Sequence, residues 1–344
     1  MTGDPAAYDI VIPTIGRPSL ELLRRSLSGC DARPASITVV DDSRSRLGPA
    51  AARNHGAAFG SAPWIVFLDD DVLTTPMWQD ALLDDLRRAA DDVAAIQARI
   101  SVPLPTDRAP TDWERNVAKL GDARWITADL AVRRDAFEAV GGFDEIFERA
   151  YREDSDLALR LESAGWRLTV GERWTTHPVR PATFLTSVTT QRGNADDALM
   201  TFKHGRQFRA RLGEPASMLW KHWLTTIVGA LAIVAGLTRH RRAAVAAIAS
   251  WMALTTQFTW KRTHRGPGGA DEIARMVVTS ILIPPVAVYW SVKGRLRAGR
   301  LGRSMGTVDG RPRMGPPRLT RHKQMPDVST WLLEPRGAGV GPRR

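Results

Sequence analysis

The chain has 344 residues, of which 43% are hydrophobic and 25% are charged, the balance of a globular protein with a sizeable core. Its one cysteine, Cys30, excludes an internal disulfide framework and a zinc site built from cysteines. The same usage fits a reducing, cytoplasmic setting. The first residues lack the basic n-region and long apolar h-region of a signal peptide, so we expect none.

The net charge of +11 is concentrated towards the C-terminus. Residues 291–344 carry 13 Lys and Arg against 3 Asp and Glu, so the preceding residues are almost neutral. This distribution argues against a nucleic-acid-binding surface on the main domain and against nucleic acid as a partner. Residues 301–344 are also rich in Gly and Pro, with too little apolar content for a core. They are predicted to form a flexible basic tail.

Short apolar runs alternate with helical stretches through the first part of the chain. The runs predict strands over residues 8–13, 36–40, 64–68, 93–98 and 167–170. The stretches between them predict helices over 19–27, 50–60 and 78–88 and a further helix beginning at 153. This alternation is typical of an α/β fold, a mostly parallel sheet flanked by helices. We predict such a domain over residues 7–212, with its ligand site beyond the carboxyl ends of the strands.

From residue 213 the composition becomes apolar. Three stretches follow, over residues 223–237, 243–260 and 273–292, the last interrupted by Pro284-Pro285. Each is at or below the ~20 residues that cross a bilayer. The loops between them are basic, which would put positive charge on both sides of a membrane. We therefore predict a helical region over 213–300 that lies in or against the cytoplasmic leaflet, the basic tail facing anionic lipid. The alternative is a soluble helical subdomain.

The segment WIVFLDDDV brings three carboxylates to the end of a predicted buried strand. Asp69 and Asp71 are two residues apart, so they point to the same side of an extended segment. Burying two carboxylates that repel one another, without a cation between them, is unfavourable. Hard oxygen ligands of this kind suit Mg²⁺ or Mn²⁺. The segment therefore predicts a divalent-metal site. An acidic turn that caps the next helix is the alternative.

Several segments, taken in order, resemble glycosyltransferase family 2 with its GT-A fold. They are VIPTIGRP, VVDDS, AARNHGAAFGSAPWIVFLDDDV, AVRRDAFEAVGGFDE and EDSDLALRLESAGWRL. The resemblance covers residues 9–177, roughly half of the chain. It implies a GT-A domain within 7–212, a nucleotide-sugar donor, a hydroxyl acceptor and inversion at the anomeric carbon.

The resemblance also implies roles for particular residues. Donor-binding residues would be Pro13, Thr14, Arg17, Asp42, Arg53, Asp69 and Asp70. Asp69, Asp71 and His177 would hold the metal, and Asp154 would be the base that deprotonates the acceptor. Weaker implications place Glu153, Asp129 and Gly142 on the acceptor side.

Each assignment has a structural alternative. Glu153 and Asp154 begin a helix, where the helix dipole favours acidic side chains. His177 precedes a proline and has the character of an ordinary loop residue. Gly142 lies in a tight turn that needs glycine torsions.

The function expected from these features is sugar transfer from a nucleotide-sugar to a glycan or lipid-linked acceptor in cell-envelope synthesis. We expect it at the inner face of the cell membrane, by single addition because the QxxRW segment of processive synthases is only loosely matched. One alternative is a nucleotidyltransferase, although Gly16-Arg17 is a poor Gly-rich phosphate loop. The other is a non-catalytic membrane adaptor with a degenerate transferase domain.

Overall fold

A computed structural model describes residues 4–28, 34–305, 307–308, 311–312 and 326–331. The chain divides into two compact units, which we describe separately. Unit 1 comprises residues 1–103, 120–178 and 315–344, and unit 2 comprises residues 104–119 and 179–314. The domain boundaries inferred from the sequence, after residues 212 and 300, stay predictions.

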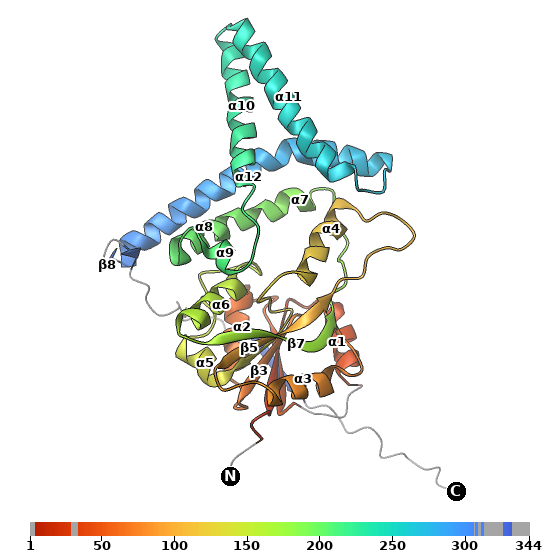
Figure 1. Ribbon diagram of the computed structural model, residues 1–344, viewed down its shortest axis with the longest axis vertical. Helices are drawn as coiled ribbons and strands as arrows, with labels where there is room; N and C mark the ends of the chain where they lie inside the picture. The colour runs from red at the N-terminus through yellow and green to blue at the C-terminus, as the bar shows by residue number, and fades with distance from the viewer. Residues whose placement is uncertain (1–3, 29–33, 306, 309–310, 313–325, 332–344) are drawn as a thin grey trace. The chain divides into compact units, whose positions relative to one another are not determined.

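Unit 1 is built on an eight-stranded sheet of order β10-β2-β1-β3-β6-β5-β7-β4. Its strands are β1 (Tyr8–Thr14), β2 (Ser36–Asp41), β3 (Trp64–Leu68), β4 (Leu73–Thr74), β5 (Val93–Ser101), β6 (Asp129–Arg133), β7 (Arg167–Thr176) and β10 (Asp327–Trp331). Its helices are α1 (Ser19–Leu27), α2 (Pro49–Ala57), α3 (Trp78–Arg87), α5 (Arg134–Ala139) and α6 (Glu153–Ser163), drawn around the sheet in Figure 1. The α/β fold class predicted from the sequence is confirmed.

The strands run mostly in one direction. β1 is parallel to both β2 and β3, and β5 is parallel to β7. β6 lies between β3 and β5 and is antiparallel to both, so β3 and β5 share a direction. The carboxyl ends of β1, β2, β3, β5 and β7 therefore meet at one edge of the sheet. β6 enters the sheet at that edge, where Asp129 pairs with Leu68.

Alternating side chains of the central strands pack on both faces of the sheet. Ile10, Ile12, Trp64 and Val66 belong to one buried cluster, which also contains residues of α1 and α3. Val11, Ile65 and Phe67 belong to a second cluster with residues of α2, α5 and α6. Burial on both faces explains the uninterrupted apolar runs of these strands. It also fixes their register, and with it the side chains at the strand ends.

Unit 2 is mainly helical. Its elements are α4 (Asp112–Ala118), followed by the 3₁₀ turn η1 (Lys119–Gly121), then α7 (Thr186–Thr189), η2 (Thr190–Arg192), α8 (Gly193–His204), α9 (Phe208–Arg211), α10 (Leu219–Leu237), α11 (Arg241–Thr263), α12 (Ala270–Met305), β8 (Thr307–Val308) and β9 (Arg311–Pro312). β8 and β9 pair with one another. The apolar helical region predicted from the sequence is present in α10, α11 and α12.

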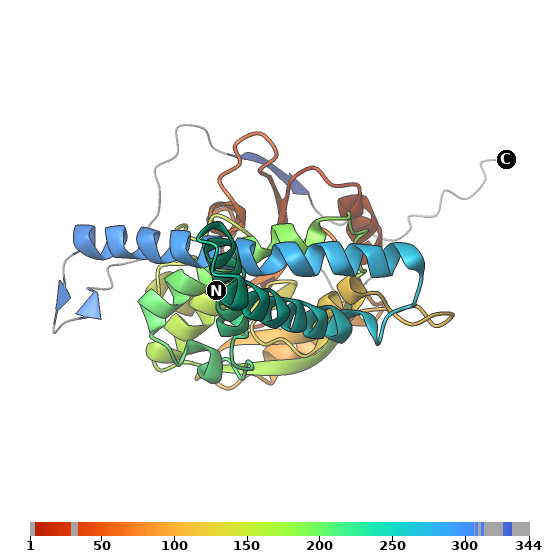
Figure 2. The same cartoon turned by 90° about the horizontal axis from the view of Figure 1, so that it is seen from above.

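Two helices of unit 2 form an antiparallel hairpin. His222 of α10 packs edge-on against Phe258 of α11, and the Cα of Gly229 lies close to the Trp251 ring. The hairpin rises from α12 rather than lying along it (Figure 1), and α12 runs across its base in the perpendicular view (Figure 2). The other side of α12 packs on α8, where Gly294 leaves room for the backbone of Ala195.

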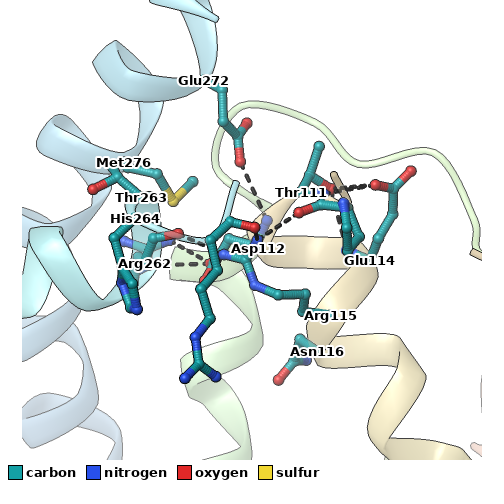
Figure 3. Close-up of polar contacts among 12 residues, drawn as sticks. Thr111, Asp112, Glu114, Arg115, Asn116, Arg262, Thr263, His264, Glu272 and Met276 are labelled. Carbon is teal, nitrogen blue, oxygen red and sulfur yellow. Dashed lines mark hydrogen bonds and ion pairs between the residues drawn. The ribbon is translucent and has the colours of Figure 1, made fainter. Parts of the chain in front are cut away.

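A buried arginine fixes the base of this hairpin. Arg262, near the end of α11, donates two hydrogen bonds to Asp112 of α4 and one each to the hydroxyls of Thr279 and Ser280 on α12. Arg115 of α4 donates to the carbonyl oxygen of Arg262 in return. Figure 3 shows Asp112 and Arg115 of α4 beside Arg262 of α11. Because a buried charge is stable only when its hydrogen bonds are satisfied, this network holds α4, α11 and α12 in a defined arrangement.

Two segments differ from the sequence-based expectations. Asp327–Trp331, within the segment predicted to be a flexible tail, forms β10 and pairs antiparallel with β2. The remainder of that tail lies mostly outside the described residues. α12 continues through Pro284-Pro285, where the sequence suggests an interruption. Buried residues on both sides of the prolines, Met276, Ile283 and Ala287, pack on one face of α12, and this packing offsets the lost backbone hydrogen bonds.

Candidate active site

The carboxyl edge of the unit 1 sheet gathers most of the residues singled out from the sequence. Thr14 ends β1, Asp42 follows β2, and Asp69–Asp71 follow β3. His177 follows β7, and its backbone N–H donates to the carbonyl oxygen of Ser101 at the end of β5. Pro13 lies within β1, half-buried, beside Val40 of β2. Parallel strands thus bring segments more than a hundred residues apart to one edge.

Asp70 is buried and both of its carboxylate oxygens accept hydrogen bonds. One accepts from the Thr14 hydroxyl at 2.6 Å, and the other from the Arg17 guanidinium at 2.7 Å. The Arg17 side chain keeps 34% of its surface exposed, whereas Asp70 keeps only 2%. Asp70 therefore orients Arg17, which presents the remaining guanidinium N–H groups to solvent. A fixed, half-exposed guanidinium at a strand end is suited to an anionic ligand.

Asp42 is also buried, and it organises the loop after β2. Its carboxylate accepts from the Ser45 hydroxyl and from the backbone N–H groups of Leu47 and Gly48, at 2.7–2.8 Å. Gly48 has φ 97°, and a Cβ at this position would lie 2.6 Å from the carbonyl oxygen of Glu148. The turn therefore requires glycine. These contacts give Asp42 a loop-shaping role in addition to the donor contact expected from the sequence.

Arg53 of α2 bridges the two acidic segments of the site. Its guanidinium donates to Asp69 at 2.7 Å and to Glu153 at 2.8 Å, and only 1% of the residue is exposed. Burial opposes the charge of Arg53, but the carboxylates of Asp69 and Glu153 raise its pKa above the usual value. Arg53 is therefore a fixed cation beneath the site.

Glu153 is the most strongly perturbed acid of the site. Its side chain is 2% exposed, and the oxygen that does not face Arg53 has no hydrogen-bond partner. Burial, together with the neighbouring charge of Asp154, raises the pKa of Glu153 to about 8, although Arg53 acts in the opposite direction. A carboxyl group in this state carries a proton over much of the neutral range. Strongly perturbed acids in such positions are enriched at functional sites.

Asp154 lies in the first turn of α6, beside Glu153, and is half-buried. One oxygen accepts from the backbone N–H and hydroxyl of Ser155 at 2.6 and 3.3 Å. Burial raises the pKa of Asp154, and the hydrogen bond from Ser155 and the charges of Arg53 and Arg152 partly offset this rise. Arg152 precedes the helix with φ 81°, a left-handed conformation that is strained for arginine. A raised pKa makes this carboxylate a better proton acceptor than a solvated one.

Asp71 and His177 face one another at the same edge, with 3.7 Å between Oδ2 and Nε2. The His177 Nδ1 atom lies 3.2 Å from the Pro178 carbonyl oxygen, which can only accept, so Nδ1 carries the proton. Nε2 is then the ring nitrogen that faces Asp71. A backbone carbonyl that fixes the tautomer in this way is the usual support for a metal-binding histidine.

The described residues contain no group of three or more His, Cys, Asp or Glu side chains arranged to hold a metal ion by themselves. Asp71 and His177 nevertheless fit a cation whose other ligands come from phosphate oxygens and water, as is usual for Mg²⁺. Asp69 is paired with Arg53 through one oxygen, and its side chain keeps 28% of its surface exposed. It can therefore still reach a ligand at the strand end.

Two residues expected on the acceptor side have structural positions instead. Asp129 is fully buried, and its carboxylate accepts from Trp78, Arg173 and Thr175 at 2.5–2.9 Å. No surface of this side chain is left for an acceptor, so that expectation is corrected. Gly142 has φ 70° beside Asn54 and the Phe137 ring, where a Cβ would clash. Its role in the structure is to form this turn.

Arg152 and Arg173 are not among the site residues predicted from the sequence. Arg173 is fully buried and reaches Asp129, Asp85 and the Ile96 carbonyl oxygen. Arg173 lies beyond the strand predicted over residues 167–170, which the structure extends to Thr176, so no local pattern signalled its burial. Arg152 carries no signal either, since it stands among other charged residues.

Comparisons with known proteins find a family match and several partial relatives. Residues 10–141 match the family model of glycosyl transferase family 2. A pre-mycofactocin glycosyltransferase of Mycobacterium tuberculosis is 33% identical over 135 residues, which cover 35% of this chain and 28% of that protein. The O-antigen biosynthesis protein RfbC of Myxococcus xanthus is 26% identical over 150 residues, 34% of this chain and 11% of that protein.

Solved structures give weaker similarities. The mannosyltransferase PcManGT of Pyrobaculum calidifontis, in complex with GDP-Man and Mn²⁺, has a TM-score of 0.45 at 16% identity over 86% of each chain. Glucosyl-3-phosphoglycerate synthase of Mycobacterium tuberculosis has a TM-score of 0.38 at 14% identity, covering 61% of this chain and 81% of that one.

The resemblance to glycosyltransferase family 2 seen in the sequence is confirmed by this family match over residues 10–141. The chain spans less than a third of the length of the curated relatives that it matches.

Proposed function

We propose that the chain transfers a sugar from a nucleotide-sugar donor to a hydroxyl acceptor, with Asp154 as the base. The observation that carries the proposal is the arrangement at the strand ends. Arg53 joins Asp69, on the donor side, to Glu153, whose neighbour Asp154 has a raised pKa. A donor site and a proton acceptor are thus fixed to one buried cation, as a displacement between two bound substrates requires.

The chemical step needs one proton acceptor and a stabilised leaving group. Asp154 takes the proton of the acceptor hydroxyl as its oxygen attacks the anomeric carbon. The bond from that carbon to the diphosphate breaks at the same time, and the electron pair leaves with the diphosphate. Arg17 faces this charge from the end of β1, and direct displacement inverts the anomeric centre. Glu153, protonated beside Asp154, keeps a second negative charge away from the base.

A divalent cation, Mn²⁺ or Mg²⁺, would neutralise charge on the leaving diphosphate. Asp71 and His177 would hold it, with Asp69 as a further contact. The histidine tautomer set by Pro178 and the facing carboxylate of Asp71 support this assignment.

The apolar helices of unit 2 support a proposal for the acceptor and for the location of the protein. α10 and α12 are each long and apolar enough to cross a membrane, by length and composition. We propose that these helices hold the chain at the inner face of the cell membrane, against anionic lipid, and that the acceptor is a glycan or lipid-linked molecule of the cell envelope. The catalytic unit would then work on the cytoplasmic side, where nucleotide-sugars are made.

The test is a melting-temperature panel of UDP-, GDP- and dTDP-sugars with Mn²⁺, Mg²⁺ or EDTA, on the full chain in detergent. A ligand that binds only the folded state at 100 times its Kd stabilises it by about 2.7 kcal/mol. We expect one nucleotide class to raise the melting temperature in a metal-dependent way, and Asp71→Asn to abolish that shift.

Asp154→Asn separates binding from chemistry. It is expected to keep the nucleotide-induced shift and to lose transfer by about 10²–10⁴-fold, the usual contribution of a positioned base. Glu162→Gln, at the other end of α6, is the matched control and is expected to keep both. If no nucleotide shifts the folded chain, the adaptor alternative is favoured. If Asp154→Asn transfers at the wild-type rate, the base is another residue.

A further inference from the structure

The α10–α11 hairpin exposes an unusual amount of apolar surface. Its exposed large apolar side chains include Leu224, Ile227, Leu231, Ile233, Val234 and Leu237 on α10 and Val245, Ile248 and Met252 on α11. Leu237, at the tip, is 79% exposed. Soluble surfaces rarely carry a continuous apolar area of this kind, so the hairpin requires a covering partner.

The exposed side chains of α10 point to more than one side. Leu231 and Ile233, two residues apart on a helix of 3.6 residues per turn, point in nearly opposite directions, and both are more than half exposed. The side facing α11 is the one marked by Gly229 and Thr225. A partner protein or a membrane surface contacting one face would leave the other face in water. Only a surrounding apolar medium covers both.

From this geometry we infer that the α10–α11 hairpin crosses a lipid bilayer, with its tip at the far headgroups, while α12 lies along the near headgroups. The inference deepens the membrane association within the proposed function and does not depend on the transfer chemistry. It differs from the in-plane arrangement that the sequence alone favoured. That arrangement rested on the basic loops and could not take account of the hairpin packing.

The length of the hairpin matches a bilayer. α10 has 19 residues and α11 has 23, so the helices rise by roughly 28 and 34 Å, against a hydrocarbon thickness of about 30 Å. Two hydroxyl groups within α11 are satisfied locally, since Ser250 donates to the Ala246 carbonyl oxygen and Thr259 to that of Thr255. Such internal bonds are what a helix needs in hydrocarbon.

Both ends of the hairpin carry the side chains expected at headgroups. Trp220 and Lys221 lie at the start of α10, and Trp260 and Lys261 lie near the end of α11. Trp at an interface and Lys beside it are typical membrane anchors. The tip carries the RHRR segment, residues 239–242, all exposed. A tip that stopped within the hydrocarbon would bury these arginines at high cost, so insertion places them at the far surface.

α12 has the character of an interfacial helix. Its exposed apolar residues form a stripe of Val277, Ile281, Leu282, Tyr289, Val292 and Leu296. Arg262 at the end of α11 bonds Thr279 and Ser280 of α12, and Arg295 of α12 lies over the Trp223 ring of α10 at 5.8 Å. These contacts attach α12 to the base of the hairpin. Basic residues 293, 295, 297, 300 and 303 put more positive charge on this side than the tip carries, as the positive-inside rule requires.

Single-cysteine labelling tests this topology, because Cys30 is the only cysteine of the chain. In a Cys30→Ser background, Thr238→Cys places a thiol at the exposed tip, and Ser217→Cys places a matched thiol at the exposed base. The full chain is expressed in bacteria, and spheroplasts are treated with a membrane-impermeant maleimide before and after permeabilisation. We expect the tip cysteine to react in intact spheroplasts and the base cysteine to react only after permeabilisation, with at least tenfold contrast.

Other outcomes overturn the inference. Labelling of both cysteines only after permeabilisation would mean that the hairpin lies on the inner face. Recovery of the chain in the soluble fraction after alkaline carbonate washing, as an oligomer, would mean that a second copy covers the apolar surface. The same labelling is repeated with Asp154→Asn, which has no effect on topology. A failed inference about the membrane is thereby distinguished from a failed assignment of the base.

Discussion

The strand-end site of unit 1 and the hairpin of unit 2 place their side chains in opposite ways. At the strand ends, ionisable side chains are buried: Arg53, Asp70 and Glu153 each have 2% or less of their surface exposed. In the hairpin, apolar side chains such as Leu231 and Leu237 are exposed. Both arrangements are unfavourable in water alone. The first is resolved within the protein by ion pairs, and the second requires a partner outside it.

The two regions differ in how precisely their side chains must be placed. A buried charge network fixes geometry to a fraction of an ångström, as a chemical step requires. An exposed apolar hairpin needs no such accuracy, because a bilayer accepts any apolar surface of the right length. The sharpest tests therefore remove a buried charge from the strand-end site or add a charge to the exposed apolar surface of the hairpin.

The largest effect is expected from Arg53→Met. It leaves the Asp69 carboxylate without its cation and the buried Glu153 carboxyl group without its hydrogen-bond donor, and removing one partner of a buried ion pair typically costs about 3–5 kcal/mol. The free energy is measured by amide hydrogen exchange of β3 in the detergent-solubilised full chain. Arg99→Met is the control, because its partner Glu172 is mostly exposed and such pairs contribute about 1 kcal/mol or less.

The double variant Arg53→Met/Asp69→Asn extends this test. Replacing the Asp69 carboxylate by an amide is expected to recover part of the lost stability, since no carboxylate is then left without its cation. If Arg53→Met is no more damaging than Arg99→Met, the bridge does not hold the two acidic segments together. The buried charges of unit 1 would then contribute no more to stability than an exposed ion pair does.

Next in size is the effect of Leu231→Lys near the middle of α10. A lysine at the centre of a membrane-spanning helix costs about 2.5–3.5 kcal/mol on insertion scales, so the membrane-bound fraction is expected to fall about 100-fold. It is measured by membrane sedimentation after a carbonate wash. Leu22→Lys in α1 is the matched control, because Leu22 is 54% exposed in unit 1 and is expected to change nothing. Equal membrane binding by the two variants would contradict the hairpin's role.

A smaller loss of stability is expected from Asp129→Asn. The amide can still accept from Trp78 and Thr175, but buried Arg173 loses a charged partner, at a cost of about 1–3 kcal/mol. Because Asp129 is enclosed, we expect the nucleotide-induced rise in melting temperature to stay unchanged. If Asp129→Asn lost the nucleotide-induced rise but kept wild-type stability, Asp129 would be part of the ligand site after all.

The sequence predicted the central strands and the first helices well. The helix predicted over residues 19–27 and the strand over 64–68 have those bounds in the structure, because local apolar patterns decide them. The acidic segments at strand ends were found for the same reason, since parallel strands fix where their ends lie.

The partners of those acidic residues could not be predicted. Arg53 and Glu153 are a hundred residues apart, and no local pattern signals their contact. Asp129 is a different case, because the family resemblance placed it on the acceptor side and the structure encloses it between Trp78 and Arg173. The exposure of α10 on two sides depends on how α11 packs, which is again a non-local property.

The expected effect that is smallest per pH unit is a pH dependence of unit 1. The pKa of Glu153 is about 8 in the folded chain, raised mainly by burial, against a usual value of 4.5. Between these values the folded state binds a proton that the unfolded state has released, so stability is expected to fall as pH rises from 4.5 to 8. The slope for one proton is at most about 1.4 kcal/mol per pH unit. Exchange of β3 amides, corrected for intrinsic rates, measures it, and Glu153→Gln should flatten the slope. A wild-type slope that survives this substitution would mean that another buried group titrates, and that Arg53 holds Glu153 as a carboxylate.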